Sequence, residues 1–161
     1  MSVTHRYELT MEWTGNTGTG TSHYRGYSRD HVLGAPGKMV IAGSSDPAFR
    51  GDRGRWNPEE LLVASLAQCH MLAYLHLCAS AGVTVTAYTD APTGTLTMDQ
   101  TGDGGEVTEV TLRPSVQVTE QAMVDRALAL HDDVPAVCFI ARSVSFPVKH
   151  EPTVTVTVAG A

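Results

Sequence analysis

Alternating apolar and polar residues predict strands in the first third of the chain. Every second residue of Arg6–Trp13 is apolar, which is the pattern of a half-buried strand. A Gly- and Thr-rich turn is expected at residues 14–22, and two further strands are expected at residues 23–33 and 38–43. Residues 44–56 are polar, contain three arginines and show no period, so they predict a loop.

Residues 57–81 predict one long helix. Asn57 is a suitable N-cap, Pro58 suits the first helical position, and Glu60 at the third makes the start close to a capping box. Gly82 is expected to end this helix, which would then be roughly 36 Å long. Apolar residues occupy every face, and such a helix is expected to be buried all round. A chain of this size has difficulty covering it, so a partner chain is the expected cover.

The pattern returns to strands after Gly82. Strands are expected at residues 83–90, 94–100, 106–118 and 151–159, the first two as a pair. A shorter amphipathic helix is expected from about Thr119 to His131, followed by a break at Pro135 and a short helical restart near Cys138. Strands and helices do not alternate, so an α+β fold with mainly antiparallel pairing is favoured, as one domain over residues 1–161.

Composition excludes several functional classes. The chain carries 11 Lys and Arg against 17 Asp and Glu, a net charge of −6, and no basic stripe. This balance argues against nucleic acid or an anionic membrane as a partner. The N-terminus shows no signal-peptide pattern, and no segment was expected to be apolar over the length needed to cross a bilayer. A cytoplasmic protein is therefore expected.

The three cysteines are too few, and odd in number, for a disulfide framework. Cys69 lies in the middle of the long helix, and its position alone favours a packing role, as does that of Cys78 near the helix end. Cys138 is expected near the start of a helical turn, where a helix N-terminus lowers a thiol pKa. Cys69 and Cys138 form a plausible attacking and resolving pair, although sequence alone does not show that they meet.

Several arginines could hold a thiolate in its charged form. Arg50, Arg53 and Arg55 precede the long helix, and Arg25 and Arg29 are alternatives earlier in the chain. Loop arginines are common, so spacing does not choose between them.

A metal site is disfavoured by the spacing of the histidines and cysteines. No CxxC or HExxH motif is present, and His70 points about 100° away from Cys69 around the helix. His70 and His76 are therefore interpreted as core or interface histidines with hydrogen-bond partners.

Two segments resemble the OsmC/Ohr family of bacterial thiol peroxidases. They are NPEELLVASLAQC (Asn57–Cys69) and the less specific AVCFIARS (Ala136–Ser143); WTGNTGTGT, from Trp13, also resembles the family's N-terminal strand and turn. The resemblance covers nearly the whole chain in element order. It implies an intertwined homodimer, in which antiparallel sheets wrap two long central helices, one from each chain. Such a dimer would supply the cover that the apolar helix requires.

The resemblance also implies a chemical reaction and a role in the response to oxidative stress. The family reduces organic hydroperoxides, and hydrogen peroxide less well, with an external dithiol as reductant and with no cofactor or metal. By position, Cys69 resembles the peroxidatic cysteine and Cys138 the resolving cysteine. Glu59 matches the glutamate that partners an activating arginine, and Arg50 is the arginine that we favour, with Arg25 and Arg53 as alternatives.

Helix geometry constrains that site. Glu59 and Cys69 are separated by about 15 Å along an unbroken helix, so they cannot touch within one chain. Either Arg50 bridges much of that gap, or Glu59 acts on Cys69 of the partner chain, and we hypothesise the second. His70 replaces the apolar or aromatic residue usual in well-studied branches, and the loop before the helix is longer. A non-catalytic or redox-sensing protein that binds an apolar ligand at the dimer interface is the alternative function, and a structural pair of core thiols is a third interpretation.

Overall fold

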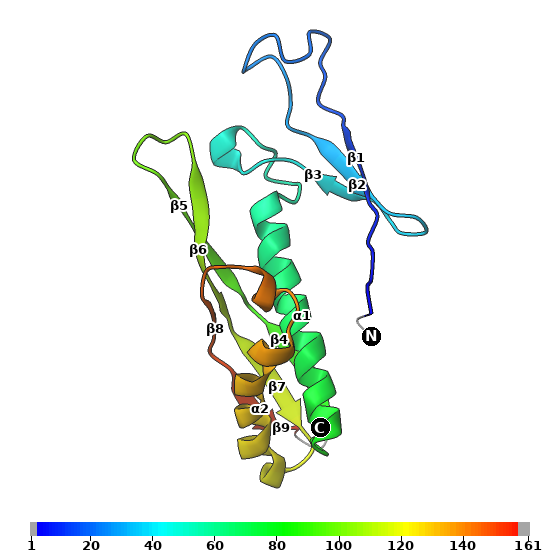
Figure 1. Ribbon diagram of the computed structural model, residues 1–161, viewed down its shortest axis with the longest axis vertical. Coiled ribbons are helices and arrows are strands. Elements are labelled where there is room, and N and C mark those ends of the chain that lie inside the picture. Colours follow the sequence, from blue (N-terminus) through cyan, green and yellow to red (C-terminus); the bar gives the residue numbers. More distant parts are fainter. Residues whose placement is uncertain (1–2, 158–161) are drawn as a thin grey trace. The chain divides into compact units, whose positions relative to one another are not determined.

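A computed structural model describes residues 3–157 (Figure 1). The chain forms two compact units, Met1–Leu61 and Leu62–Ala161, called the N-terminal and C-terminal units below. The single domain expected over residues 1–161 stays a prediction. Each unit is described separately.

The N-terminal unit contains a small antiparallel sheet. Its strands are β1 (Thr10–Trp13), β2 (His31–Gly34) and β3 (Ile41–Gly43), in that order, and a 3-10 turn follows at Pro47–Phe49. The strand expected from Arg6 is shorter than predicted, and its apolar side chains are exposed rather than half-buried. The reason is that the described part of this unit otherwise consists of loops, the 3-10 turn and the first residues of a helix, which form no second layer.

The long helix α1 (Pro58–Ser80) begins and ends as its sequence predicts. The Asn57 side-chain oxygen accepts the Glu60 N–H at 2.7 Å, and the Glu60 carboxylate accepts the Asn57 N–H at 3.1 Å, which completes the capping box. At the other end, Gly82 adopts a φ of 72°, and the Val83 N–H donates to the Cys78 carbonyl at 2.9 Å. This is a Schellman ending, in which glycine accepts the left-handed conformation without strain.

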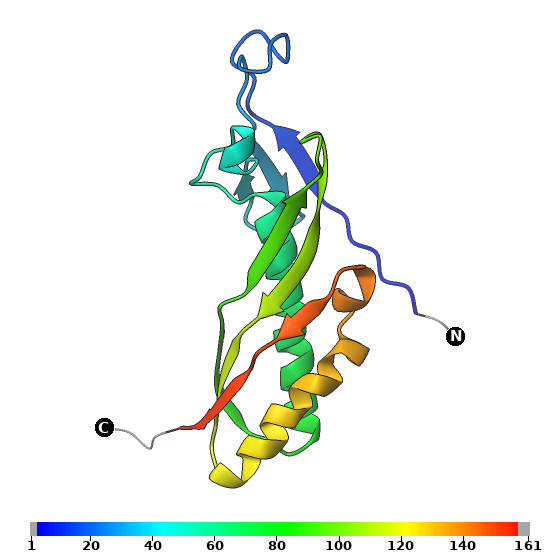
Figure 2. The same ribbon diagram turned by 90° about the vertical axis from the view of Figure 1, so that its left-hand side faces the viewer.

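The C-terminal unit contains two three-stranded sheets (Figure 2). One has the order β4 (Val85–Asp90), β7 (Pro114–Val118), β9 (Thr153–Val156), and the other β5 (Thr93–Met98), β6 (Gly105–Leu112), β8 (Val148–His150). The neighbours β4/β7 and β5/β6 are antiparallel, whereas β7/β9 and β6/β8 are parallel. The α+β class is confirmed. The predicted pairing of residues 83–90 with 94–100 is wrong, because each of these strands pairs with part of residues 105–118 instead.

The second helix, α2 (Val124–Val137), differs from its prediction at both ends. A 3-10 turn at Gln121–Met123 replaces its expected first turn. Pro135 lies inside the helix and does not break it. Proline removes one backbone donor, but so close to the helix end this loss affects only the last turn. The Cys138 N–H still donates to the Val134 carbonyl at 2.9 Å.

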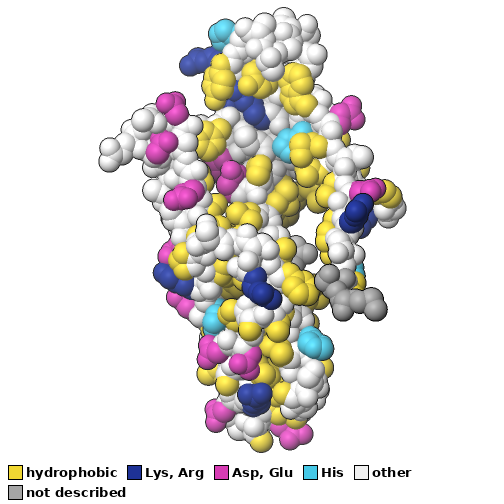
Figure 3. Space-filling view, in the orientation of Figure 1, with side chains coloured by type: hydrophobic (Ala, Val, Ile, Leu, Met, Phe, Trp, Pro, Cys, Tyr) yellow, Lys and Arg dark blue, Asp and Glu magenta, His cyan; other side chains and the backbone are white. Residues whose placement is uncertain are grey.

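One stripe of α1 is buried and the opposite stripe is exposed. The buried residues Leu66, His70, Tyr74 and Cys78 recur every fourth position, whereas Gln68, Leu72 and His76 are exposed. Leu72 is 63% exposed although it is apolar. Hydrophobic side chains are also visible over much of the surface, with acidic and basic side chains scattered among them (Figure 3).

By length and composition, α1 could also cross a membrane. The expectation that no segment reaches that length and apolarity is therefore wrong. Core helices pass the same test, and Tyr74 and Cys78 of α1 belong to a core that also contains Val116 of β7 and Leu130 of α2. The side of α1 that carries Tyr74 and Cys78 therefore packs against strands and a second helix.

Candidate functional site

The C-terminal unit brings Cys69 and Cys138 together. Cys69 is half-buried on α1 and packs against the core cluster that contains Cys138, which is 1% exposed at the end of α2. Burial and a hydrogen bond with the Cys69 thiol raise the pKa of Cys138 to about 11. Both cysteines are free thiols. Two thiols far apart in the sequence are therefore neighbours in the fold.

Cys138 lies in a different local setting from the one its sequence predicts. It caps the C-terminus of α2, and its sulfur accepts the N–H of Ala141, the first residue of a 3-10 turn (Ala141–Ser143), at 3.5 Å. This amide stabilises the thiolate, as expected of a turn N-terminus. Burial nevertheless outweighs it, so the expected lowering of the pKa of Cys138 is wrong. At neutral pH the group is a thiol.

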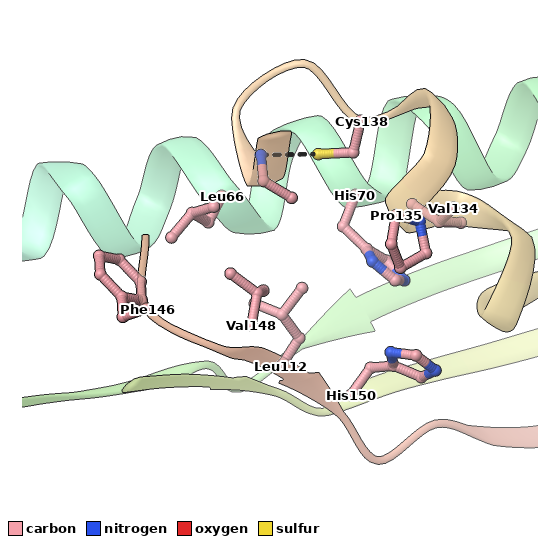
Figure 4. Close-up of a pocket in the computed structure, with 10 residues that line it drawn as sticks. Leu66, His70, Leu112, Val134, Pro135, Cys138, Phe146, Val148 and His150 are labelled. Carbon is pink, nitrogen blue, oxygen red and sulfur yellow. Dashed lines mark hydrogen bonds between the residues drawn. The ribbon is translucent and has the colours of Figure 1, made fainter. Parts of the chain in front are cut away.

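A cavity of about 130 Å³ adjoins Cys138 (Figure 4). Its walls are apolar side chains, among them Leu66 and Phe146. His70 from α1 and His150 from β8 supply its polar groups. The cavity therefore joins a thiol, two imidazoles and an apolar wall within one unit.

Three histidines and a tyrosine pack as one ring cluster beside this cavity. His70 Nε2 lies 2.9 Å from His131 Nδ1, and the His131 ring stacks on Tyr74 with 3.8 Å between centroids. The His70 and His150 rings are 5.7 Å apart, and His150 Nε2 lies 3.0 Å from the Asp132 carboxylate. The interpretation of His70 as a core histidine with a partner is confirmed.

His131 and His150 belong to no motif in the sequence. His131 belongs to the buried stripe of α2, and His150 shares the inner face of a short strand with Val148, so each could have been recognised as facing the core. Their meeting with His70 depends on tertiary packing, for which the sequence gives no local signal. His76, by contrast, is exposed in the described chain.

Burial keeps two of these histidines neutral. Burial and the nearby His150 lower the pKa of His70 to about 4, and burial with His70 and His150 lowers the pKa of His131 to about 3. Both rings therefore carry one N–H and one lone pair at pH 7. His131 Nε2 is buried and has no hydrogen-bond partner among the described residues.

The candidate arginines belong to the N-terminal unit. Arg50 has a φ of 68°, the left-handed conformation that is uncommon for a residue with a side chain, and it lines an open cavity of about 410 Å³ together with Arg25. Arg53 is not among the residues that line this cavity. Arg55 pairs with Asp30 at 3.5 Å.

Arg29 is held in place by its neighbours. Its guanidinium lies over the rings of Tyr24 and Tyr27, 4.4 and 4.1 Å from their centroids, and donates to both of their carbonyls. These contacts fix Arg29 as part of the loop structure. Arg25 and Arg50 are thus the candidates that share a cavity.

Glu59 has an unsatisfied oxygen. Its Oε2 atom is buried and finds no hydrogen-bond partner within residues 3–157. No ion pair joins Glu59 to Arg50 within the same described range. Likewise, no cluster of three or more His, Cys, Asp or Glu able to hold a metal ion occurs there.

Comparison with protein families identifies the chain. The protein family described as "OsmC-like protein" matches residues 51–153 of the chain. This range includes Cys69, Cys138 and Glu59. The chain belongs to the OsmC-like family. No curated protein matches its sequence.

Solved structures agree with this assignment. An OsmC-like protein of unknown function from Vibrio cholerae is 29% identical, has a TM-score of 0.82, and is aligned over 92% of this chain and 99% of its own. An organic hydroperoxide resistance protein from Elizabethkingia anophelis has a TM-score of 0.67 at 17% identity, over 96% and 100%. An organic hydroperoxide resistance protein from Legionella pneumophila has a TM-score of 0.65 at 18% sequence identity, aligned over 94% of this chain and 99% of its own. The last two show the OsmC fold alone.

The buried histidines of this OsmC-like chain predict loss of stability in acid. The unfolded chain takes up protons on His70 and His131 below pH 6.5, whereas the folded chain resists them until about pH 4 and 3. The free energy of unfolding should therefore fall as pH drops from 6.5 to 4, by up to about 1.4 kcal/mol per pH unit for each histidine. Urea unfolding at a series of pH values measures this slope.

Two substitutions on α1 separate this effect from general acid unfolding. His70→Gln should flatten the slope, because it removes one of the protons taken up on unfolding. His76→Gln, at an exposed position of the same helix, should leave it unchanged. Equal slopes in the wild type and His70→Gln would contradict the assignment.

Proposed function

We propose that this protein is a cysteine-based peroxidase that reduces organic hydroperoxides, and hydrogen peroxide less well, to alcohols or water. The observation that carries the proposal is the contact between the free thiols of Cys69 and Cys138. Membership of the OsmC-like family, and the names of relatives as organic hydroperoxide resistance proteins, support it. Free thiols and a dithiol reductant fit a reducing compartment, so we place the protein in the cytoplasm.

The reaction follows from thiol chemistry. The Cys69 thiolate attacks the outer oxygen of the hydroperoxide, the O–O bond breaks, and the alkoxide leaves as an alcohol after taking up a proton. Cys69 becomes a sulfenic acid. Cys138 then attacks the sulfur of Cys69, and the disulfide and water form. An external dithiol returns both residues to thiols through a mixed disulfide.

Arg50 and Glu59 support the first step in this proposal. The guanidinium of Arg50 stabilises the Cys69 thiolate and the charge that develops on the leaving alkoxide, and Glu59 orients Arg50. The Oε2 atom of Glu59 is buried and has no hydrogen-bond partner within residues 3–157, which supports a donor from a second chain.

A second chain is the proposed source of that donor. The exposed Leu72 stripe of α1 and the apolar side chains of β1 suit burial between two copies of the chain. We propose a homodimer in which Glu59 acts on Cys69 of the partner chain.

Thiol titration tests the peroxidase function. One equivalent of cumene hydroperoxide should consume two thiols rapidly in the reduced protein and produce a Cys69–Cys138 disulfide, which peptide mass mapping detects. Cys69→Ser should abolish the loss of thiols. In Cys138→Ser, oxidation should stop after one thiol. Cys78→Ser is the matched control, because Cys78 is buried in the core and should leave the reaction intact.

Other outcomes of this titration distinguish the alternative functions. Slow or absent thiol loss at neutral pH would overturn the peroxidase. Loss of one thiol in the wild type without a disulfide would favour the redox sensor.

The choice of arginine predicts a rate difference in the first step. Arg50→Ala should slow oxidation of Cys69 by about 10²-fold, because one donor to the developing charge is lost. Arg53→Ala, in the same loop, should keep the wild-type rate. Stopped-flow measurement of single-turnover oxidation compares them. If Cys69 oxidation is slow in Arg25→Ala or Arg53→Ala but not in Arg50→Ala, that other arginine is the one that stabilises the developing charge.

The composite site predicts recovery of activity when two inactive variants are mixed. Sedimentation should give the mass of two chains. Glu59→Gln and Cys69→Ser chains, unfolded and refolded together, should regain about a quarter of wild-type activity, because half of the dimers are mixed and each has one intact site. A chain that uses its own Glu59 would show no recovery.

A further inference from the structure

Cys138, His150 and Asp132 form a series of thiol, imidazole and carboxylate in the C-terminal unit. Cys138 and His150 line the same cavity (Figure 4), and His150 Nε2 lies 3.0 Å from Asp132 Oδ1. A nucleophile, a base and a group that orients the base are the parts from which activated nucleophiles are built. Asp132 lies on α2, His150 on β8, and Cys138 follows α2.

The hydrogen bond to Asp132 determines which nitrogen of His150 is basic. A carboxylate only accepts hydrogen bonds, so neutral His150 donates its Nε2–H to Asp132. The lone pair is then on Nδ1. Because His150 lines the cavity, its ring is placed to accept a proton from there.

Cys138 requires such a base. It is almost completely buried, and burial, with the Cys69 hydrogen bond, raises its pKa to about 11. A thiolate, not a thiol, is the nucleophile in disulfide formation. Without a base, Cys138 would attack through a very small thiolate fraction at neutral pH.

The cavity and its neighbours provide a route for the proton. A volume of about 130 Å³ has room for water, and Cys138, His70 and His150 offer it polar partners. His70 and His131, which face His150 from α1 and α2, stay neutral because burial lowers their pKa values, so they add no positive charge against a proton on His150. Asp132 is 81% exposed and connects His150 to solvent.

We propose that His150 is the general base of the disulfide-forming step, acting on Cys138 through water in the cavity, and that Asp132 positions it. This inference rests on the proposed peroxidase function. The Cys138 sulfur forms a bond to the Cys69 sulfur, and the S–O bond of the sulfenic acid breaks. The proton from Cys138 passes to His150 and is returned to the leaving hydroxide, which becomes water. No electron donor beyond Cys138 is required in this step.

Single-turnover kinetics test the role of His150. Cumene hydroperoxide is mixed with reduced protein, trapping with dimedone reports the Cys69 sulfenic acid, and acid quench with mass analysis reports the disulfide. His150→Asn should leave the first step unchanged and slow the second by about 10²-fold. In the variant, the rate of the second step should also rise about tenfold per pH unit, because hydroxide must then remove the proton from Cys138. The wild type should show a shallower dependence.

Matched variants separate a catalytic role from a structural one. His5→Asn, at an exposed position of the N-terminal unit, should behave as wild type in both steps. Asp132→Asn should slow only the second step, and Asp133→Asn, which removes the same charge from the next exposed position of α2, should not. If His150→Asn fails to fold, the comparison of Asp132→Asn with Asp133→Asn decides: a slow second step with a steeper pH profile supports the proposal, and equal rates overturn it.

Two failures are distinguishable. A second step in folded His150→Asn that keeps the wild-type rate and pH profile would overturn the role of His150 and leave the peroxidase intact. A wild-type Cys69 that does not oxidise would overturn the peroxidase, and with it the step assigned to His150.

Discussion

The packing of α2 on α1 through stacked rings is the constraint on which the candidate site depends. Tyr74 of α1 stacks on His131 of α2 and donates its hydroxyl to the Ala127 carbonyl at 3.0 Å, while His70 shares a hydrogen bond with His131. Cys69 is adjacent to His70, and Cys138 follows His131 by about two helical turns. The contacts that hold the helices together therefore also hold the two thiols together.

This arrangement has an electrostatic consequence for both kinds of side chain. The burial that aligns Cys138 with Cys69 raises the pKa of Cys138, and the same burial lowers the pKa values of His70 and His131. In each case the neutral form is favoured. A core that suppresses charge suits the resolving role proposed for Cys138, in which its thiol stays unreactive until Cys69 has been oxidised. It also makes proton transfer the difficult part of disulfide formation, which gives the His150–Asp132 pair its proposed importance.

Local signals in the sequence were sufficient for the features that local physics decides. The Asn57–Glu60 capping box and the Gly82 ending were predicted correctly, because each involves backbone groups within a few residues. The partners of β4 and β5 were not, since alternation shows which face of a strand is buried but not which strand lies beside it. The predicted break at Pro135 is wrong, because the cost of a proline in a helix depends on its distance from the helix end.

Some residues of the candidate site could likewise be predicted from the sequence, and others only from the fold. Cys69 and Cys138 are candidates both by position and by resemblance, Glu59 is a candidate by resemblance alone, and the fold brings the two thiols together. His131 and His150 carry no motif, and only the packing of α2 and β8 places them beside His70. Their contribution could not be read from spacing, because the three histidines come from separate elements.

One proposed feature accounts for observations that a single chain leaves unexplained. Within one chain, Leu72 of α1 is 63% exposed, on a stripe that also carries Gln68 and His76. At the start of the same helix, Glu59 has a buried oxygen that finds no hydrogen-bond partner within residues 3–157. Exposed apolar area and an unsatisfied buried acceptor both cost free energy, and a second copy of the chain would relieve both by covering the stripe and supplying a donor. If so, the apolarity of α1 and the charge at its first turn serve the same purpose: the helix forms the dimer core and brings Glu59 to the partner's thiol.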